Sequence, residues 1–392
     1  MASRSFLENL RNLPEDVLKM VRREKVASPV EQRVFSERLP TFSSKQETVA
    51  SPEHPDRNED ASFIDTERGL MALSDGAGGQ NAGEVASRAA MTGVREAMAT
   101  LDKMLARERQ RIGSSYVSAE NVSAVLDEAV RGIVKKVRGV SDKIAAAGRG
   151  DQDRCFATLM LAKIIETGPG EWAAVVKGIG DSKAVIRRAD GRIEQVQIKD
   201  DGIMEIWKRE GFPERNRVTG EMSYLPLSGD EAFLIEQSNG IDDFQNKLDA
   251  FNRAQGVSMI EADQKRLTKI FRQYKRDRNQ VTRMLGMKGE NPDAHSTIVN
   301  LRAGDRLYLL SDGITDNLTL EEMQQAADRT RDGNVSAEWV RSSQERMADG
   351  TDRSKKDDAT VVELGLPQSA IQIAKENDQE QIDAIRMKLG IA

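Results

Sequence analysis

The 392-residue sequence contains one cysteine, Cys155, and two histidines, His54 and His295. A single cysteine excludes both an internal disulfide and a thiolate metal cage, and it is typical of a reducing compartment. Two histidines are too few for a metal site built from several imidazoles. Any metal bound by this chain is therefore expected to be held by carboxylates.

Long apolar runs and a strong charge of one sign are also missing. No stretch of about 18 apolar residues occurs, so no membrane-spanning helix is expected, and acidic residues interrupt the first 25 positions where a signal peptide would be apolar. The 58 basic and 64 acidic residues leave a net charge of −6, which argues against a nucleic-acid-binding protein. We expect a cytoplasmic protein that binds neither nucleic acid nor membrane, in an oligomeric state that the sequence leaves open.

The two ends of the chain differ from its middle. Residues 5–24 place apolar side chains on one stripe and predict one helix or two short ones, and residues 25–57 are polar and predict extended chain or linker. We divide the chain into an N-terminal helical extension and linker at 1–40, a main domain at 41–366, and a charged C-terminal helix at 367–392.

The main domain alternates strand-like and helical patterns. Apolar residues at helical spacing predict helices, and β-rich runs with short turns predict strands. The strands from 158 to 198 are expected to form one antiparallel meander. Two groups of strands around a helical pair indicate an α+β layered sandwich. The helices are expected at 82–109, 118–147, 319–329 and 335–348, and the strands at 61–64, 70–73, 158–165, 172–178, 184–188, 193–198, 296–301, 306–310 and 359–364.

Two segments far apart in the chain repeat one local pattern. Residues 70–76 and 307–313 both consist of an apolar strand followed by Ser-Asp-Gly. Each places a carboxylate, Asp75 or Asp312, at the end of a buried strand, where the glycine permits a sharp turn. Two such carboxylates at one edge of a sandwich repel each other unless a cation lies between them. Taken alone, either residue is more typical of an ordinary turn aspartate.

Further acidic residues stand at the ends of other predicted strands. Glu59 and Asp60 precede the strand at 61–64, Asp357 begins an Asp-Asp pair before the last strand, and Asp181 lies in a turn between two strands. As a set, these residues favour a metal site over a group of solubilising charges. Because only oxygen ligands are offered, a hard divalent ion, Mg²⁺ or Mn²⁺, is expected.

The order of these motifs resembles that of the PPM-type, metal-dependent protein serine/threonine phosphatases, the type 2C family, in its bacterial form. The resemblance covers roughly residues 41–366. Each motif is weak alone, but six in the same order are highly specific. They are Asn58-Glu59-Asp60-Ala61; Asp75-Gly76-Ala77-Gly78-Gly79 with Gly83-Glu84-Val85-Ala86-Ser87; Gly180-Asp181-Ser182-Lys183-Ala184; Val281-Thr282-Arg283-Met284-Leu285-Gly286; Ser311-Asp312-Gly313-Ile314-Thr315-Asp316; and Asp357-Asp358-Ala359-Thr360-Val361-Val362.

The resemblance implies a four-layer α-β-β-α sandwich of two antiparallel sheets flanked by helix pairs. It also implies two bound Mn²⁺ or Mg²⁺ ions. Asp75 is expected to bridge both ions, and the Gly76 carbonyl is expected to bind one of them. Asp312 and Asp357 are expected to complete the other.

Four more acidic residues match positions near the metals of similar enzymes. Glu59 and Asp60 are expected to act through direct or water-mediated contacts. Asp181 and Asp316 match the positions that hold a third, weaker ion.

The implied activity is hydrolysis of phosphoserine and phosphothreonine on proteins phosphorylated by a serine/threonine kinase. Two cations about 3.5–4 Å apart would neutralise the phosphate and lower the pKa of an attacking water, with no covalent intermediate. Cys155 is then not required as a nucleophile and is expected in the core. The alternatives are a catalytically weak sensor or scaffold that binds phosphoproteins, and a hydrolase of small phosphoesters.

The chain departs from the family pattern before the first acidic motif. Pro55 stands where many members carry a phosphate-binding arginine, and Arg57 is the nearest substitute. Arg57 either reaches the phosphate as a bidentate donor or is a plain surface arginine. His54 could approach the site, but a solvated loop histidine is the simpler expectation.

Residues 200–290 correspond to the flap that the family carries beside its active site, and here the flap is expected to be an enlarged helical insertion. A long helix is predicted at about 261–285. Its basic side chains either form a solvated face or recruit an acidic or phosphorylated partner. These side chains are Lys265, Arg266, Lys269, Arg272, Lys275, Arg276 and Arg278.

Overall fold

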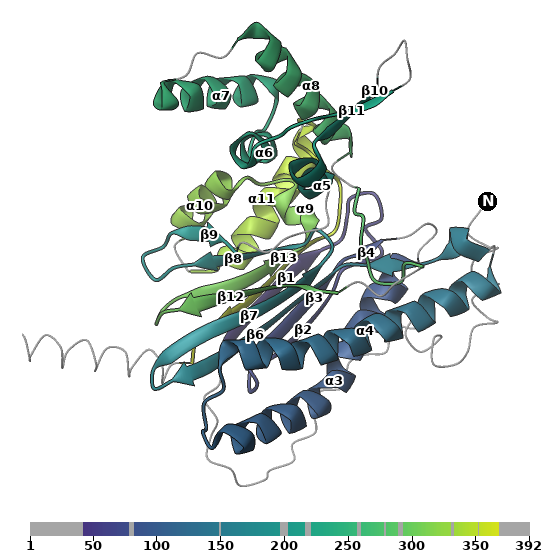
Figure 1. Ribbon diagram of the computed structural model, residues 1–392, viewed down its shortest axis with the longest axis vertical. Coiled ribbons are helices and arrows are strands. Elements are labelled where there is room, and N and C mark those ends of the chain that lie inside the picture. The colour runs from purple at the N-terminus through teal and green to yellow at the C-terminus, as the bar shows by residue number, and fades with distance from the viewer. Residues whose placement is uncertain are drawn as a thin grey trace, which may run out of the picture.

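The structure is a computed structural model. It describes residues 42–77, 82–148, 150–196, 203–215, 221–256, 260–277, 280–288, 293–330, 333–351 and 353–367. The helix expected at 5–24 and, beyond residue 367, the helix expected at 367–392 lie outside the described residues. Within these ranges the centre of the molecule is a pair of five-stranded antiparallel sheets, packed face to face between layers of helices (Figure 1).

Each sheet draws its strands from distant parts of the sequence. The first sheet has the order β12-β7-β6-β3-β2, and the second has the order β1-β14-β13-β8-β9. The strands of the first are β2 (Ala61–Asp65), β3 (Leu70–Ser74), β6 (Leu159–Gly168), β7 (Glu171–Ile179) and β12 (His295–Leu301). Those of the second are β1 (Ser43–Val49), β8 (Lys183–Arg187), β9 (Ile193–Gln195), β13 (Arg306–Leu310) and β14 (Ala359–Gly365).

The central strands are apolar on both faces because both faces are covered. In β3, Leu70 and Ala72 belong to the apolar cluster under the first helix pair, whereas Met71 and Leu73 belong to the cluster between the sheets. This alternation follows from the two-residue period of a strand. It explains why β3 appears in the sequence as a continuous apolar run rather than as an alternating pattern.

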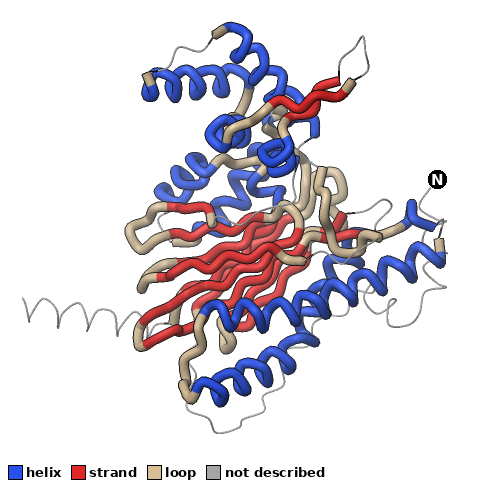
Figure 2. The backbone as a smooth tube through the Cα atoms, in the orientation of Figure 1, coloured by secondary structure: helices blue, strands red, loops and turns tan. Residues whose placement is uncertain are grey.

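Helix pairs complete the four layers. Helices α3 (Gly83–Ile112) and α4 (Ala119–Ala147) cover the first sheet, and α10 (Leu320–Arg329) and α11 (Val335–Asp349) cover the second (Figure 2). Ser118 and Thr319 cap α4 and α10 by accepting hydrogen bonds from backbone N–H groups in the first turn. The predicted α+β sandwich of two antiparallel sheets flanked by helix pairs is confirmed.

One expectation about the strands is wrong. The expected four-stranded meander is divided between the sheets, since β6 and β7 pair in the first while β8 and β9 belong to the second, where β8 pairs with β13. Gly180 lies at this crossover with a φ of 99°, a conformation that glycine adopts readily. Residues 43–49, expected as extended chain or linker, form β1 at the sheet edge, paired with β14.

The predicted insertion forms a helical unit with its own core. It contains α5 (Ile203–Glu210), β10 (Phe212–Arg215), β11 (Met222–Leu225), α6 (Gly229–Glu236), α7 (Ile241–Gln255) and α8 (Glu261–Asp277). Phe244 and Phe271 stack in its centre with ring centroids 4.9 Å apart. An apolar core of this kind favours a folded subdomain rather than a loose flap.

The long helix of the insertion is shorter than expected. It ends at Asp277 rather than near residue 285. Leu285 instead pairs with Ala157 in a β-bridge and is fully buried. No helix in the described part of the chain is both long and apolar enough to cross a membrane.

Candidate metal centre

The acidic motifs meet at one end of the two sheets. Asp75 follows β3 and Asp312 follows β13, while Asp60 precedes β2 and Asp357 stands just before β14. In the antiparallel registers, Ser74 is opposite Ala61 in the first sheet, and Leu310 is opposite Val361 in the second. The ends of β3 and β13 therefore lie beside the starts of β2 and β14, and the crossover with Asp181 lies at this same end.

The backbone of Asp75 is held by Thr158, at the start of β6. The Asp75 N–H donates to Thr158 Oγ1 at 2.9 Å, and the Asp75 carbonyl accepts from the Thr158 N–H at 2.8 Å. The Ser74 hydroxyl also donates to the Thr158 carbonyl at 2.6 Å. These bonds fix the direction in which the carboxylate of Asp75 leaves the strand end.

The carboxyl groups raise one another's pKa values. Burial, followed by the charges of Asp312 and Asp60, raises the pKa of Asp75 well above its ordinary value. Burial raises the pKa of Asp312 to about 6, against the opposing charge of Lys355. Burial and the charge of Asp312 raise the pKa of Asp181 to about 7. Such shifts show carboxylates that are crowded together away from water and favour a bound cation.

The loop that carries Glu59 and Asp60 is attached to the second sheet by Asp358. The backbone N–H groups of Ser51 and Glu59 each donate to the Asp358 carboxylate at 2.6 Å. Burial raises the pKa of Glu59, and the charge of Arg57 opposes this shift. Burial also raises the pKa of Asp60 well above its ordinary value.

Gly76 joins the Glu59 loop to the start of α3. It lies in the short strand β4 (Gly76–Ala77), which pairs with β5 (Phe156–Ala157), and its N–H donates to the Glu59 carbonyl at 3.1 Å. A Cβ atom on Gly83 would come 2.5 Å from the Gly76 carbonyl oxygen. The absence of side chains at both glycines therefore allows the two backbones to touch.

Lys355 lies among the carboxylates of the second sheet. Its ammonium contacts Asp312 Oδ2 and lies 3.0 Å from Asp357 Oδ2 and 3.1 Å from Asp316 Oδ2. Burial lowers the pKa of Lys355, but the charges of Asp312, Asp316 and Asp357 outweigh it and raise the pKa well above the ordinary value. Lys355 is therefore a charged, internal partner of these acidic residues.

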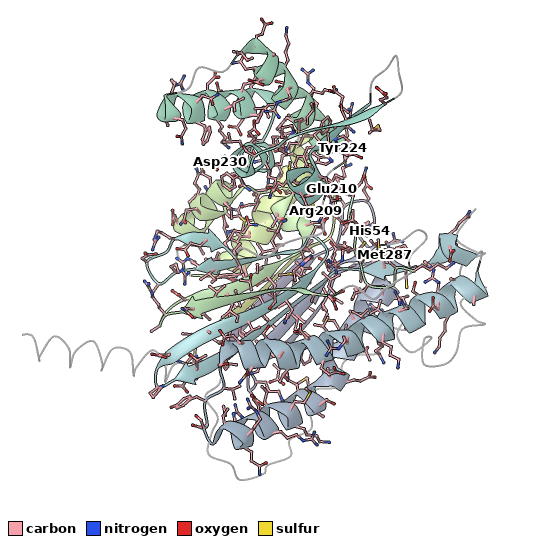
Figure 3. The ribbon with its side chains drawn as sticks, in the orientation of Figure 1. His54, Arg209, Glu210, Tyr224, Asp230 and Met287 are labelled. Atoms are coloured by element: carbon pink, nitrogen blue, oxygen red, sulfur yellow. The ribbon has the colours of Figure 1, made fainter. Side chains whose placement is uncertain are left out.

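Arg57 and His54 lie at the rim of the cluster. Arg57 Nε is 3.5 Å from Glu59 Oε1, so Arg57 faces the acidic residues. The His54 ring, expected in solvent, is partly buried, with Nδ1 3.7 Å from Asp358 Oδ1 and 3.3 Å from the Arg57 carbonyl oxygen. Figure 3 shows His54 beside the strand ends, whereas Tyr224 and Asp230 lie in the insertion.

The oxygen atoms of the cluster suit a hard divalent cation. Glu59 Oε1 and Asp312 Oδ1 are buried and accept no hydrogen bond from any described residue, and buried acceptors of this kind are costly unless a cation or water binds them. Among the described residues, no group of three or more aspartate, glutamate, histidine or cysteine side chains is already arranged to hold a metal ion. Three of the carboxylates surround the Lys355 ammonium. The residues fit oxygen-bound Mg²⁺ or Mn²⁺.

Two residues of the site were not found from the sequence. In the sequence, Asp358 is only the second residue of an acidic pair. Its neighbours do not indicate that it accepts hydrogen bonds from the Ser51 and Glu59 N–H groups rather than binding a metal ion. Lys355 precedes the motif by two positions, next to Lys356, and a pair of lysines before acidic residues is typical of a solvated surface.

The fold and the acidic motifs agree with the comparison against protein families. The model of the protein phosphatase 2C family matches residues 54–349, more than half of the chain. The chain therefore belongs to the protein phosphatase 2C family of serine/threonine phosphatases, as the six ordered motifs predicted. A comparison with curated proteins gave no match.

Solved structures of bacterial phosphatases are similar to this chain. The serine/threonine phosphatase PstP/Ppp of Mycobacterium tuberculosis is 22% identical, with 84% of this chain and 100% of that chain covered and a TM-score of 0.50. The PstP catalytic domain in complex with two manganese ions is 21% identical, with coverages of 84% and 99% and a TM-score of 0.48. Stp1 of Staphylococcus aureus is 20% identical, with coverages of 86% and 99% and a TM-score of 0.47. At this identity, the likeness to PstP/Ppp shows a common fold.

Proposed function

We propose that this phosphatase hydrolyses phosphoserine and phosphothreonine on proteins, using a water activated by two divalent metal ions and forming no covalent intermediate. The observation that carries the proposal is the meeting of Asp75 and Asp312. They leave different sheets, yet burial and the charge of Asp312 raise the pKa of Asp75, and burial with the charges of Asp357 and Asp316 raises the pKa of Asp312. Two buried carboxylates in this relationship are best stabilised by bound cations.

The positions of the carboxylates and the family motifs together support one set of ligands for the two metal ions. Asp75, the Gly76 carbonyl, Asp312 and Asp357 would hold two Mn²⁺ or Mg²⁺ ions. When bound, the pair of ions would neutralise phosphate charge and lower the pKa of the attacking water. Glu59 and Asp60, which belong to the loop anchored by Asp358, would orient groups around the ions directly or through water.

Arg57 is the side chain best placed to bind the phosphate group. It faces the acidic cluster from its rim, 3.5 Å from Glu59, and its side chain is 30% exposed, so a ligand can reach it. A guanidinium offers paired N–H donors that match two phosphate oxygens. Arg57 would therefore hold the substrate's phosphate against the metal ligands.

The chain offers no cysteine nucleophile at the site. Cys155 is fully buried, and burial raises the pKa of its thiol to about 11. A thiol in this state is almost never a thiolate at neutral pH and is a poor nucleophile. This supports direct attack by water and agrees with the expectation that Cys155 belongs to the core.

The insertion supplies one wall of a pocket that adjoins part of the acidic cluster. A pocket beside Asp181, Asp312 and Asp316 is lined from the insertion by Met204 and Tyr274. A protein substrate has residues around its phosphoamino acid that could contact this wall, whereas a small phosphoester does not. The substrates would be proteins phosphorylated by a serine/threonine kinase.

The test is phosphate release from a phosphothreonine peptide in Mn²⁺, Mg²⁺ or EDTA. The wild-type chain is expected to turn over only with a divalent ion, and Asp75→Asn and Asp312→Asn are expected to lose this activity while remaining folded. Asp190→Asn is the control, because Asp190 lies in an exposed turn and pairs with Arg192. It should retain full activity.

A folded wild-type chain that releases no phosphate with any divalent ion would overturn the proposed hydrolysis. Binding of the phosphopeptide without turnover would then support the alternative, a phosphoprotein-binding sensor or scaffold of the same fold. Unchanged activity in both aspartate variants would instead contradict the proposed metal ligands.

A further inference from the structure

The ammonium group of Lys355 occupies a place between carboxylates where a bound cation would otherwise lie. Its ammonium contacts Asp312 Oδ2, Asp357 Oδ2 and Asp316 Oδ2, and the side chain is only 9% exposed. Three carboxylates from separate positions thus surround one positive charge. A buried lysine with three carboxylate partners is compensated in the way that a bound metal ion would compensate the same oxygens.

The position of Lys355 is fixed by a buried side chain. Asn317 accepts a hydrogen bond from the Lys355 N–H at 2.9 Å and donates to the Lys355 carbonyl at 2.8 Å. It also donates to the Gly313 carbonyl at 2.8 Å, in the short helix α9 (Asp312–Thr315) that begins at a proposed metal ligand. The lysine is therefore built into the segment that carries its carboxylate partners, whereas the neighbouring Lys356 is exposed.

The two oxygens of Asp312 have different surroundings. Oδ2 binds Lys355, whereas Oδ1 is buried and receives no hydrogen bond from the described residues. Asp312 can therefore hold the lysine with one oxygen and offer the other to a metal ion. Asp316, at one of the two positions expected for a third ion, contacts the same ammonium.

We propose that Lys355 supplies the positive charge of the third metal position, so that this phosphatase binds two divalent ions and not a third. The inference rests on the proposed metal site. An ammonium and a divalent ion repel each other strongly at contact distance, so Asp312 Oδ2 and Asp316 Oδ2 can hold one or the other at that place. Asp312 Oδ1 stays available to the second ion. Asp357 Oδ2 also contacts Lys355, so Asp357 would hold the second ion through a water molecule rather than directly. Lys355 also stabilises the metal-free protein, because it compensates three carboxylates without any ion.

The test compares Lys355→Met with Lys356→Met in the full-length chain. Lys355→Met keeps an unbranched side chain of similar length and removes the charge, and Lys356→Met makes the same change at the exposed neighbour. Mn²⁺ bound per chain is measured by equilibrium dialysis. The wild type and Lys356→Met are expected to bind two ions, and Lys355→Met three. Lys355→Arg, which keeps a positive charge, should bind two.

A second variant localises the additional ion. Lys355→Met combined with Asp316→Asn removes a carboxylate that would hold it, and should return the count to two. Thermal unfolding in EDTA gives a readout without metal. Lys355→Met should unfold at a lower temperature than Lys356→Met, and saturating Mn²⁺ should remove most of the difference. If Lys355→Met unfolds without metal, the ion count is still measurable, because equilibrium dialysis is carried out in the presence of Mn²⁺.

The outcomes separate this inference from the proposed function. Three ions bound to the wild type, or two bound equally tightly by wild type and Lys355→Met, would overturn the role of Lys355 and leave metal-dependent hydrolysis standing. A folded wild-type chain that binds no Mn²⁺ would overturn both.

Discussion

The carbonyl oxygen of Gly76 lies directly against Gly83, so that a Cβ atom on Gly83 would be only 2.5 Å from it. This contact joins the strand end that follows Asp75 to the first residue of α3. Real Cβ atoms do not approach backbone oxygens so closely, and a larger residue at position 83 must therefore displace the Gly76 carbonyl. The direction of a proposed metal ligand thus depends on a residue that binds no metal.

The contact predicts the behaviour of Gly83→Ala. The methyl group should move the Gly76 carbonyl and weaken metal binding, so that Mn²⁺-dependent activity falls about tenfold or more, and the overpacked contact should cost about 1–3 kcal/mol of stability. Gly132→Ala is the control, since its added Cβ meets open space on α4 and alanine favours helices. An unchanged Mn²⁺ affinity in Gly83→Ala, measured by calorimetry, would contradict this dependence.

The central strands and the carboxylates at their ends could be predicted because their signals are local. A buried strand that ends in Ser-Asp-Gly marks both its own end and the carboxylate there, and the structure has Asp75 and Asp312 just beyond the ends of the buried strands β3 and β13. The long helices α3 and α4 were found because their apolar spacing persists over many turns. These features depend on residues that are neighbours in the chain.

Asp358 connects the second sheet to the Glu59 loop, and Asp358→Ala should detach them. The change leaves the N–H groups of Ser51 and Glu59 without their acceptors, which should cost about 2–4 kcal/mol of stability. Urea denaturation in EDTA measures this loss without any metal. Asp358→Asn keeps one acceptor oxygen and should lose less. Equal losses in the two variants would show that the hydrogen bonds are not the source of the effect.

Arg57 is proposed to bind the phosphate, and its substitution should act on catalysis rather than on folding. Arg57→Ala should lower kcat/KM for a phosphothreonine peptide by about 10- to 100-fold, the effect of losing about 1.5–3 kcal/mol of charge-assisted hydrogen bonding. Arg57→Lys keeps the charge without the paired donors and should be intermediate. Steady-state kinetics with unchanged unfolding temperatures would support this role. Unaltered kinetics in Arg57→Ala would leave Arg57 only as an ion-pair partner of Glu59.

The features that the sequence did not indicate depend on contacts between distant residues. β1 has mostly polar, exposed side chains, and it becomes a strand because β14 offers a free edge for pairing. The division of the expected meander depends on β8 pairing with β13, and the short turns between the strands carry no sign of this. Lys355 is enclosed only because Asn317 and three carboxylates from the folded structure surround it. No local pattern contains that information.

Lys163 provides a prediction that is independent of the metal centre. It lies on β6, is 8% exposed, and donates to the Arg68 carbonyl. Burial lowers the pKa of its ammonium to about 8, and the positive charge of Arg109 adds to this effect, against the opposing charges of Asp102 and Asp65. The folded protein therefore holds this proton less tightly than the unfolded chain, in which the pKa is about 10.4.

The sign of the pH dependence follows from proton binding. Between about pH 8 and pH 10.4 the unfolded chain binds more protons at Lys163 than the folded protein does, so this residue's contribution to the free energy of unfolding rises with pH. Below about pH 8 the cost of the buried ammonium is fully present, on the order of 1–3 kcal/mol. Lys163→Met should therefore be more stable than the wild type at pH 7, by less than that cost because the hydrogen bond to Arg68 is lost.

The advantage of Lys163→Met should shrink as the pH rises from 8 to 10, because the wild type then loses its unfavourable charge. Urea denaturation of both proteins across this range measures the difference and cancels the titration of other groups. Lys177→Met is the matched control, since Lys177 is also buried, at 1% exposed, but pairs with Asp127 at 2.6 Å, and its removal leaves that carboxylate without its partner. It should destabilise the protein at pH 7. A constant difference between Lys163→Met and wild type from pH 7 to pH 10 would mean that Lys163 is not held with a lowered pKa.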